Sequence, residues 1–245
     1  MTSAPDPEYA HGPNQEAGET GGPALLFGSI PAPFGLIYVP DKLIVLNDAT
    51  ATANHIRASE SLLRFGIGYE LWQATMFIFV VLALYRLFKA VNEAHALAMM
   101  ILILLSIPMY LLSVVNEIAA LLVVSGANFL SVFDPSQLNT LAYIFMRLHN
   151  RTILVGEIVG ALWFFPFGIL VIRSRFIPRI LGYLLFVAAF GYLPGHLTNL
   201  LLPAYGPLVD KFASSLTVCE VPIILWLLIW GAKDQHSQAT DPAAA

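Results

Sequence analysis

The chain has 245 residues, of which 58% are hydrophobic and only 11% are charged, and its formal net charge is −4. Soluble domains carry about 25% charged residues, so this composition excludes an ordinary soluble protein and indicates an integral membrane protein. Several of the acidic residues lie in the first twenty positions, so the net charge carries no information about nucleic acid, and no nucleic-acid partner is expected.

Two polar tails flank a hydrophobic body. Residues 1–22 contain no Lys or Arg and are rich in Pro, Gly and Glu, so they lack the basic start of a signal peptide and are predicted to be disordered. Residues 232–245 have a similar composition and are predicted to form a second disordered tail. The body between them, residues 23–231, is the predicted membrane domain.

The body contains six segments that are apolar enough to cross a membrane, which takes about 20 mainly apolar residues per helix. The first segment is the weakest, because it is short and contains Pro31 and Pro33. The sequence therefore predicts an all-α fold, a polytopic bundle of six transmembrane helices with short amphipathic helices at the membrane surface. The six predicted spans are residues 23–40, 61–86, 95–124, 147–173, 177–202 and 208–231.

The connections between the spans carry their own signals. Asp48 suits a helix N-cap, and Asp134 followed by Pro135 suits the start of an amphipathic helix that could run into the fourth span. The short loops around residues 86–95 and 173–179 are rich in Arg and Lys, so the positive-inside rule places them in the cytoplasm. Both chain termini are then cytoplasmic, and the protein is predicted to lie in the cell membrane.

Polar side chains recur along five of the predicted spans. Within each span they are three, four or seven residues apart, or adjacent, so each set lies on one helical face. At about 1.5 Å per residue, these sets lie roughly 9–18 Å below the outer boundary of the membrane. We therefore expect a polar pocket in the outer half of the membrane. The sets are Glu70 and Gln73; Ser113, Asn116 and Glu117; Asn150 and Glu157; Tyr192, His196 and Asn199; and Ser214, Thr217 and Glu220.

The carboxyl groups at this depth outnumber the cations, since only Arg147 and Arg151 lie close to four glutamates. An unpaired buried charge costs free energy, so at least one of these acids is expected to be protonated and able to donate a proton. Polar groups also join membrane helices through hydrogen bonds, and this structural role is the preferred interpretation of Ser113 and Thr217. Gly156 and Gly160 form a GxxxG pair that favours close helix packing.

The candidate site residues follow from these patterns. His149, His196 and several glutamates are of residue types that bind metals, and the sequence leaves open whether either histidine does so. No Glu-x-x-His or His-x-x-x-His pair occurs, so neither a metal nor another cofactor is predicted. His95 and His149 lie near expected helix ends and are interpreted as interfacial. The candidate catalytic residues are Glu117, Glu220, Asn116, Asn150 and His196, and the candidate binding residues are Glu70, Gln73, Glu157, Tyr192, Asn199 and Trp163.

Separate motifs follow one another along the body in a characteristic order, among them "DKLIVLNDATATANHIRASESLLRFGIGYE", "LALYRLFKAVN", "LWFFPFGILV" and "RSRFIPRILGYLL". Over about residues 24–231 they resemble a bacterial six-span membrane family that is catalogued only as a domain of unknown function. The resemblance implies the six-span fold and no reaction. Members tend to carry Asp after "GYL", where this chain has Pro194, Gly195 and His196, and often Gln at the position of Glu157. The resemblance therefore favours Asn116, Glu117, Asn150 and Glu220 over Glu157 as common functional residues.

The leading functional hypothesis is an intramembrane enzyme that isomerises or cyclises an isoprenoid or another lipid-soluble substrate by acid–base chemistry. Glu117 or Glu220 would donate the proton, and His196 or Asn150 would orient the acid. A proton-coupled small-molecule transporter is the alternative, because carboxyl groups inside spans are equally natural there. A non-catalytic membrane chaperone or sensor is a third interpretation. Membrane lipids and a lipid-soluble small molecule are the expected partners.

Overall fold

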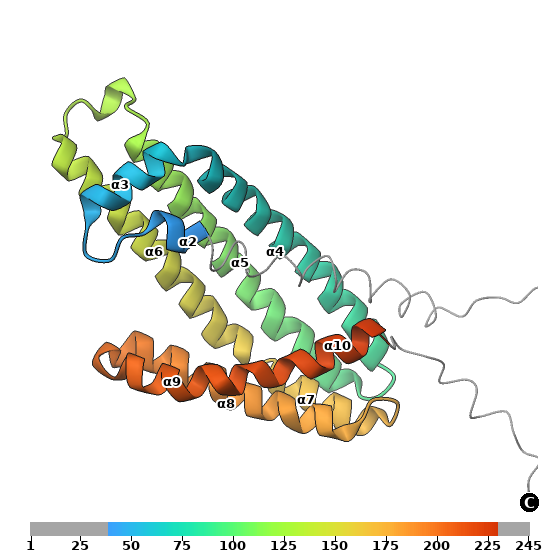
Figure 1. Cartoon of the computed structure of the whole chain (residues 1–245). Helices are drawn as coiled ribbons and strands as arrows, with labels where there is room; N and C mark the ends of the chain where they lie inside the picture. Colours follow the sequence, from blue (N-terminus) through green and yellow to red (C-terminus); the bar gives the residue numbers. More distant parts are fainter. Residues whose placement is uncertain (1–38, 230–245) are drawn as a thin grey trace, which may run out of the picture.

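The computed structural model describes residues 39–229, and the structural statements below refer to this part of the chain. The tails predicted at residues 1–22 and 232–245, and nearly all of the weak span predicted at 23–40, lie outside it. Within the described residues all regular elements are helices, and there is no strand (Figure 1). The prediction of an all-α fold is confirmed for this part of the chain.

Five helical segments of the described chain are long and apolar enough to cross a membrane, so the protein is a multi-pass membrane protein. The count of six spans stays a prediction, because the first lies outside the described residues. The five segments are α4 (Glu60–Phe88), α5 (Glu93–Val124), α6 with α7 (Pro135–Ala161 and Phe164–Ser174), α8 (Arg179–Leu201), and a segment from Pro203 to Ile229 that holds η3 (Pro203–Tyr205), α9 (Gly206–Thr217), η4 (Val218–Glu220) and α10 (Val221–Ile229).

Polar side chains cap the helices at the positions that the sequence indicates. The N–H of Ala51 donates a 2.8 Å hydrogen bond to Oδ1 of Asp48 at the start of the short helix α3 (Ala49–Ala58), which follows α2 (Val39–Leu43). At the start of α6, the N–H of Asp134 donates to the side chain of Gln137 at 2.9 Å. These bonds satisfy backbone groups that a helix start leaves without intrahelical partners. Both predicted helix starts are confirmed.

Two of the intramembrane prolines interrupt their helices. Pro166 has no N–H to donate to the carbonyl of Leu162, and the chain breaks between α6 and α7 at Leu162 and Trp163. In the same way, Pro222 cannot donate to Val218, and the 3₁₀ turn η4 separates α9 from α10. These breaks place Trp163 and Glu220 at helix junctions.

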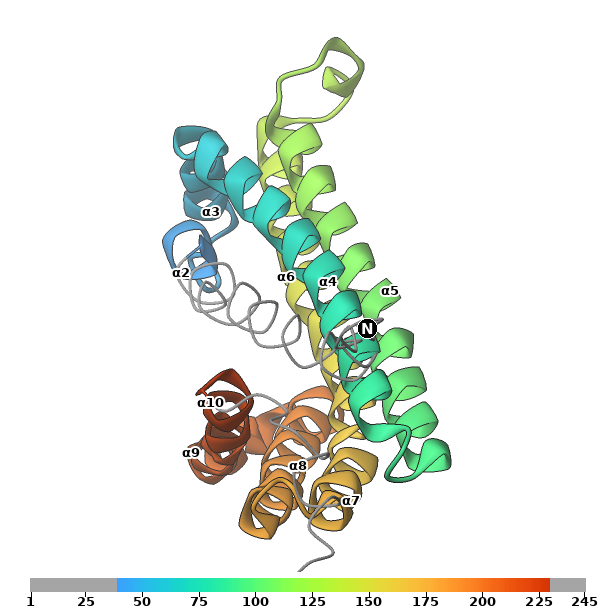
Figure 2. The ribbon, with the colours of Figure 1, turned by 90° about the vertical axis from the view of Figure 1, so that its right-hand side faces the viewer.

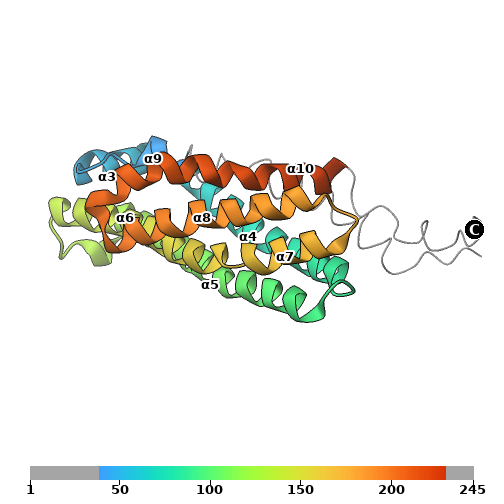
Figure 3. The same ribbon diagram turned by 90° about the horizontal axis from the view of Figure 1, so that it is seen from below.

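The helices form two groups that share α6. In Figures 1 and 2, α4, α5 and α6 lie side by side, and α7, α8, α9 and α10 gather near one end of them. Figure 3 shows α8 running alongside α9 and α10, and α6 contacts both α5 and α8. A Cβ on Gly156 would lie only 3.0 Å from Cβ of Met109, so this glycine permits the close approach of α6 to α5 that its GxxxG pair predicts.

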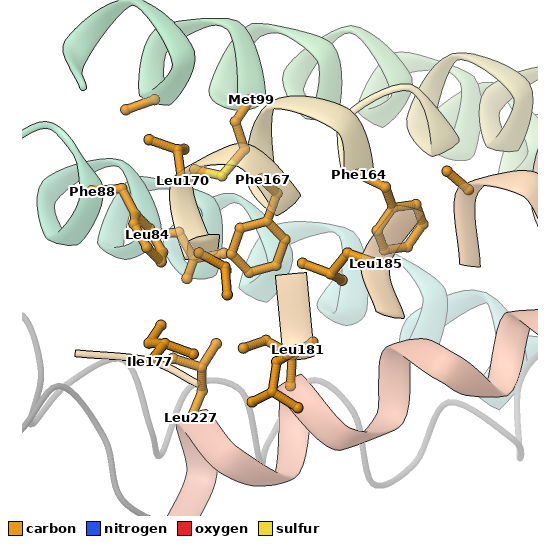
Figure 4. Close-up of a cluster of buried hydrophobic side chains, with 14 of the residues drawn as sticks. Leu84, Phe88, Met99, Phe164, Phe167, Leu170, Ile177, Leu181, Leu185 and Leu227 are labelled. Carbon is orange, nitrogen blue, oxygen red and sulfur yellow. The ribbon is translucent and has the colours of Figure 1, made fainter. Parts of the chain in front are cut away.

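The apolar core consists of two clusters with polar residues between them. One cluster includes Phe88, Phe167 and Leu185 (Figure 4). Its members Phe88 and Ile177 place it toward the loops that join α4 to α5 and α7 to α8. The other includes Ile56 and Met146 and lies toward α3 and the short 3₁₀ helix η2 (Asn128–Leu130). Along α4, α5 and α6, the chain passes from one cluster to the other through a stretch that carries the candidate polar residues.

Candidate functional site

Three titratable side chains meet in the interior between α4, α5 and α6. Nε2 of His149 lies 3.7 Å from Oε1 of Glu70 and 3.9 Å from Oε1 of Glu117. One potential ligand atom from each residue lies within 4.8 Å of the other two. The side chains of His149 and Glu117 are 1% and 2% exposed, and that of Glu70 is 11% exposed. We call this set the closed cluster.

The imidazole of His149 is held in one orientation. Its Nδ1 lies 3.2 Å from the carbonyl oxygen of Ser113. A carbonyl can only accept a hydrogen bond, so Nδ1 carries the hydrogen in this bond, and in the neutral ring Nε2 presents its lone pair. Nε2 is the atom that faces the two carboxyl groups. The second oxygen of Glu117, Oε2, is buried and has no hydrogen-bond partner among the described residues.

The expectation that His149 lies at an interface near a helix end is wrong. The amphipathic helix that begins at Pro135 does run into the predicted fourth span, as the single helix α6, and this places His149 near the middle of the helix. The side chain is buried on the same stripe as Ala142, Met146 and Gly156. This stripe, with spacings of four, three and seven residues, is the sequence signal that identifies His149 as an interior residue.

Four further candidates form a second, more open cluster. The hydroxyl of Tyr192 donates a 2.7 Å hydrogen bond to Oε1 of Glu220, and Nε2 of His196 lies 3.5 Å from Oε2 of Glu157. These residues come from α6, α8 and the turn η4. The side chains of Glu157 and His196 are 30% and 19% exposed, in contrast to the closed cluster. We call this set the open cluster.

Aromatic rings join the two pairs of the open cluster. The ring of Tyr192 stacks on His196 with centroids 5.5 Å apart, and on Phe164 with centroids 5.6 Å apart. Trp163, predicted as a binding residue, stacks on Phe167 at 4.8 Å and meets Phe77 edge to face at 6.2 Å. Trp163 therefore packs with the apolar core, while its neighbour Phe164 forms one wall of the open cluster.

The remaining amide candidates do not bond to either cluster. Asn116 donates to the carbonyl of Leu112 in its own helix at 3.1 Å, and Asn150 is exposed. Gln73 is half-buried and forms no hydrogen bond among the described residues. Asn199 donates to the carboxylate of Asp210 at 2.7 and 2.9 Å. The structure thus sorts the predicted polar residues into two clusters and a separate group of amides.

The two arginines expected near the glutamates do not neutralise them. The guanidinium of Arg151 donates to the carbonyl oxygen of Asn199 at 2.9 Å. Among the described residues, neither Arg147 nor Arg151 forms an ion pair with a glutamate of either cluster. Within residues 39–229, the closed cluster therefore brings two carboxyl groups and one imidazole together without a Lys or Arg ion-pair partner.

Residues 20–231 match a family model described as Domain of unknown function (DUF4386). The chain belongs to this family. The match includes every described residue and confirms the resemblance seen in the sequence motifs. Comparison of this DUF4386 chain with curated proteins and with solved structures finds no match. Its chemistry therefore has to be inferred from its own side chains.

Proposed function

We propose that this DUF4386 protein is an intramembrane enzyme that moves protons on a lipid-soluble substrate, an isoprenoid or another lipid, at the open cluster. The supporting observation is that two acid–base pairs lie next to each other on a partly exposed face. One pair joins His196 to Glu157 at 3.5 Å, and the other joins Tyr192 to Glu220 at 2.7 Å. The stacked rings of Tyr192 and His196 hold the two pairs together.

Two paired groups suit a reaction that adds one proton and removes another. Transfer of a proton from the carboxylic acid of Glu220 to an alkene carbon forms a new C–H bond and leaves a carbocation. Loss of a proton from a neighbouring carbon to the carboxylate of Glu157, whose side chain is 30% exposed, then forms a double bond at a new position, so the formula of the substrate is unchanged. Cyclisation begins and ends with the same two proton transfers.

The neighbouring groups would assist both transfers. The hydroxyl of Tyr192 donates to one carboxyl oxygen of Glu220, so the other oxygen would hold the transferred proton. Nε2 of His196 is buried 3.5 Å from Oε2 of Glu157 and would take up the proton that Glu157 removes from the substrate. The faces of Tyr192 and Phe164 would stabilise positive charge on the substrate, because an aromatic ring carries negative potential on its face.

Deuterium incorporation tests this proposal without knowledge of the substrate. Purified protein in lipid nanodiscs is incubated with a total lipid extract in D₂O, and the lipids are analysed by mass spectrometry. The wild type should introduce carbon-bound deuterium into one lipid class, and Glu220→Gln should reduce the rate by roughly 100-fold or more, since an amide has no acidic proton to give. Glu60→Gln, at an exposed glutamate of α4, serves as the control. Equal incorporation by wild type and Glu220→Gln would contradict the proposal.

A proton-coupled small-molecule transporter is the second candidate, and the closed cluster favours it. Carboxyl groups and histidines in the interior of spans bind and release protons in pumps and carriers. In proteoliposomes with a pH-sensitive dye inside, a transporter would change the internal pH when its solute is added. The enzyme proposal predicts no such change and predicts a co-purified lipid. A non-catalytic chaperone or sensor would show neither deuterium incorporation nor a solute-dependent pH change.

A further inference from the structure

We infer that Glu70, Glu117 and His149 bind one divalent transition-metal ion, and that Zn²⁺ suits these ligands best. The inference does not rest on the reaction proposed for the open cluster. His149 and Glu157 are eight residues apart on α6, which is about 12 Å along a helix. The metal site and the proposed reaction site are therefore separate places in the same bundle.

The spacing of the three side chains suits a shared ion better than direct hydrogen bonds. Nε2 of His149 is 3.7 and 3.9 Å from the two Oε1 atoms, whereas N–H···O hydrogen bonds span about 2.7–3.2 Å. Two ligand atoms at about 2.0–2.1 Å from a tetrahedral Zn²⁺ lie roughly 3.4 Å apart. The ligand atoms of Glu70 and Glu117 lie within 4.8 Å of each other, so side-chain movements of about half an ångström would bring all three atoms into coordination.

A second observation, independent of the spacing, is the orphaned oxygen of Glu117. Its Oε2 is buried without a hydrogen-bond partner among the described residues, in a side chain that is only 2% exposed. A buried polar atom without a partner destabilises a folded protein, and most buried polar atoms in folded proteins are satisfied. A cation bound beside this carboxylate would supply the missing interaction.

His149 has the arrangement of a metal-binding histidine. Metal-ligating histidines donate their other ring N–H to a carbonyl or carboxylate, which fixes the ring and its tautomer. In this structure the carbonyl oxygen of Ser113 accepts from Nδ1 at 3.2 Å, and Nε2 faces the carboxyl groups. Because Ser113 precedes Glu117 by one turn of α5, the same helix positions one ligand and orients another.

Charge balance favours a divalent ion. The closed cluster holds two carboxyl groups, and no Lys or Arg forms an ion pair with them among the described residues. A dication neutralises two carboxylates in a low-dielectric interior, where isolated charges are costly. The ligand set of one imidazole nitrogen and two carboxylate oxygens suits Zn²⁺, whereas Ca²⁺ and Mg²⁺ prefer oxygen alone. Three protein ligands also match the number found in catalytic zinc sites.

Zinc binding to the purified full-length chain tests the inference. The protein is prepared in mild detergent without a polyhistidine tag, treated with a chelator, equilibrated with Zn²⁺ and desalted. Elemental analysis should find about one zinc per chain. Loss of a residue that only hydrogen-bonds to a metal ligand weakens metal binding by roughly 10- to 100-fold. Glu117→Gln and His149→Asn remove ligands themselves, so each should weaken zinc binding by more than this. Glu157→Gln, another intramembrane glutamate, is the matched control and should keep the full affinity.

A spectroscopic readout locates the bound ion. Co²⁺ in place of Zn²⁺ should give visible absorption of a coordinated ion in the wild type and in Glu157→Gln, and this absorption should be lost in His149→Asn. Where Glu117→Gln fails to fold by size-exclusion chromatography, Glu70→Gln replaces it, since Glu70 is the more exposed ligand. A wild type without stoichiometric zinc would overturn the inference and would indicate that the closed cluster binds only protons. Equal zinc affinity in all variants would also overturn it and would indicate that surface histidines bind the zinc.

Discussion

At the scale of single residues, Glu117 is the carboxyl side chain that most needs a polar partner, because it is the most deeply buried one among the described residues. It is almost completely buried, one of its oxygens has no hydrogen-bond partner in the described part of the chain, and its other oxygen lies 3.9 Å from Nε2 of His149. The sequence predicts its burial and its interior orientation, because a carboxyl group inside an apolar span has to face a polar interior. The sequence does not predict that His149 is its neighbour, because that contact depends on how α5 and α6 pack.

Removal of the Glu117 carboxyl group should destabilise the fold in a graded manner. Glu117→Gln keeps the shape and polarity of the side chain, so we expect little change in the free energy of unfolding. Glu117→Leu leaves Nε2 of His149 and Glu70 beside an apolar group, and should lower the free energy of unfolding by about 1–3 kcal/mol. Denaturant titration in detergent measures both changes, with Glu93→Leu at an exposed position as the control. Equal stability of Glu117→Leu and wild type would contradict a polar contact at this position.

Tyr192 allows a second test at this scale. Tyr192→Phe removes the hydroxyl that donates to Glu220 at 2.7 Å and keeps the ring that stacks on Phe164. The fold should therefore remain, while the rate of deuterium incorporation falls by roughly 10- to 100-fold because Glu220 loses its orienting partner. Tyr183→Phe, at an exposed tyrosine of the same helix, is the matched control. Equal loss of rate in both variants would show that the hydroxyl of Tyr192 has no specific role.

At the scale of helices, capping residues predict where a helix starts, whereas the depth of a residue along a span does not predict which residues it contacts. The starts of α3 and α6 follow from Asp48, Asp134 and Pro135, because a cap depends only on neighbouring residues. A count of residues from each helix end places the polar groups at one depth, but it cannot give the direction in which each helix faces. Nor does it include the break at η4, which sets the position of Glu220. The single predicted pocket therefore resolves into two clusters.

The contact between α5 and α6 depends on Gly156. A Cβ at this position would lie 3.0 Å from Cβ of Met109 and 3.6 Å from the carbonyl oxygen of Ser106. Gly156→Ala should separate the helices locally and lower the free energy of unfolding by about 1–3 kcal/mol. Gly68→Ala on α4 is the control, because a Cβ there meets nothing within 4 Å, and alanine should raise helix stability by up to about 1 kcal/mol. A silent Gly156→Ala would show that this interface adjusts without cost.

At the scale of the whole molecule, composition alone predicts an integral membrane protein, because only 11% of the residues are charged, against about 25% in soluble domains. The five described spans agree with this prediction. The orientation in the membrane rests on the basic loops, which include Arg173, Arg175 and Arg179. The distribution of charged residues between loops can be counted directly in the sequence. The contacts between side chains on different helices cannot, because they depend on how the helices pack.

Cysteine labelling tests the orientation. In a Cys219→Ala background, Asp134→Cys should react with a membrane-impermeant thiol reagent on intact cells, because the loop before α6 is predicted to lie outside the cytoplasm. Arg175→Cys should react only after the membrane is permeabilised. The Cys219→Ala protein without a new cysteine gives the background signal. The opposite labelling pattern would invert the predicted topology and place both termini outside.

The two apolar clusters also have an electrical consequence. A biological membrane holds a voltage, and an elementary charge that crosses it releases about 2.3 kcal/mol per 100 mV. A continuous row of acids and histidines through the bundle would leak protons and discharge that voltage. In this protein, tightly packed side chains such as Phe88 and Ile56 stand on either side of the polar stretch. His149 and Glu157 are also eight residues apart on α6, a rise of about 12 Å along the helix. The protein can thus keep titratable groups inside the membrane while the membrane remains an insulator.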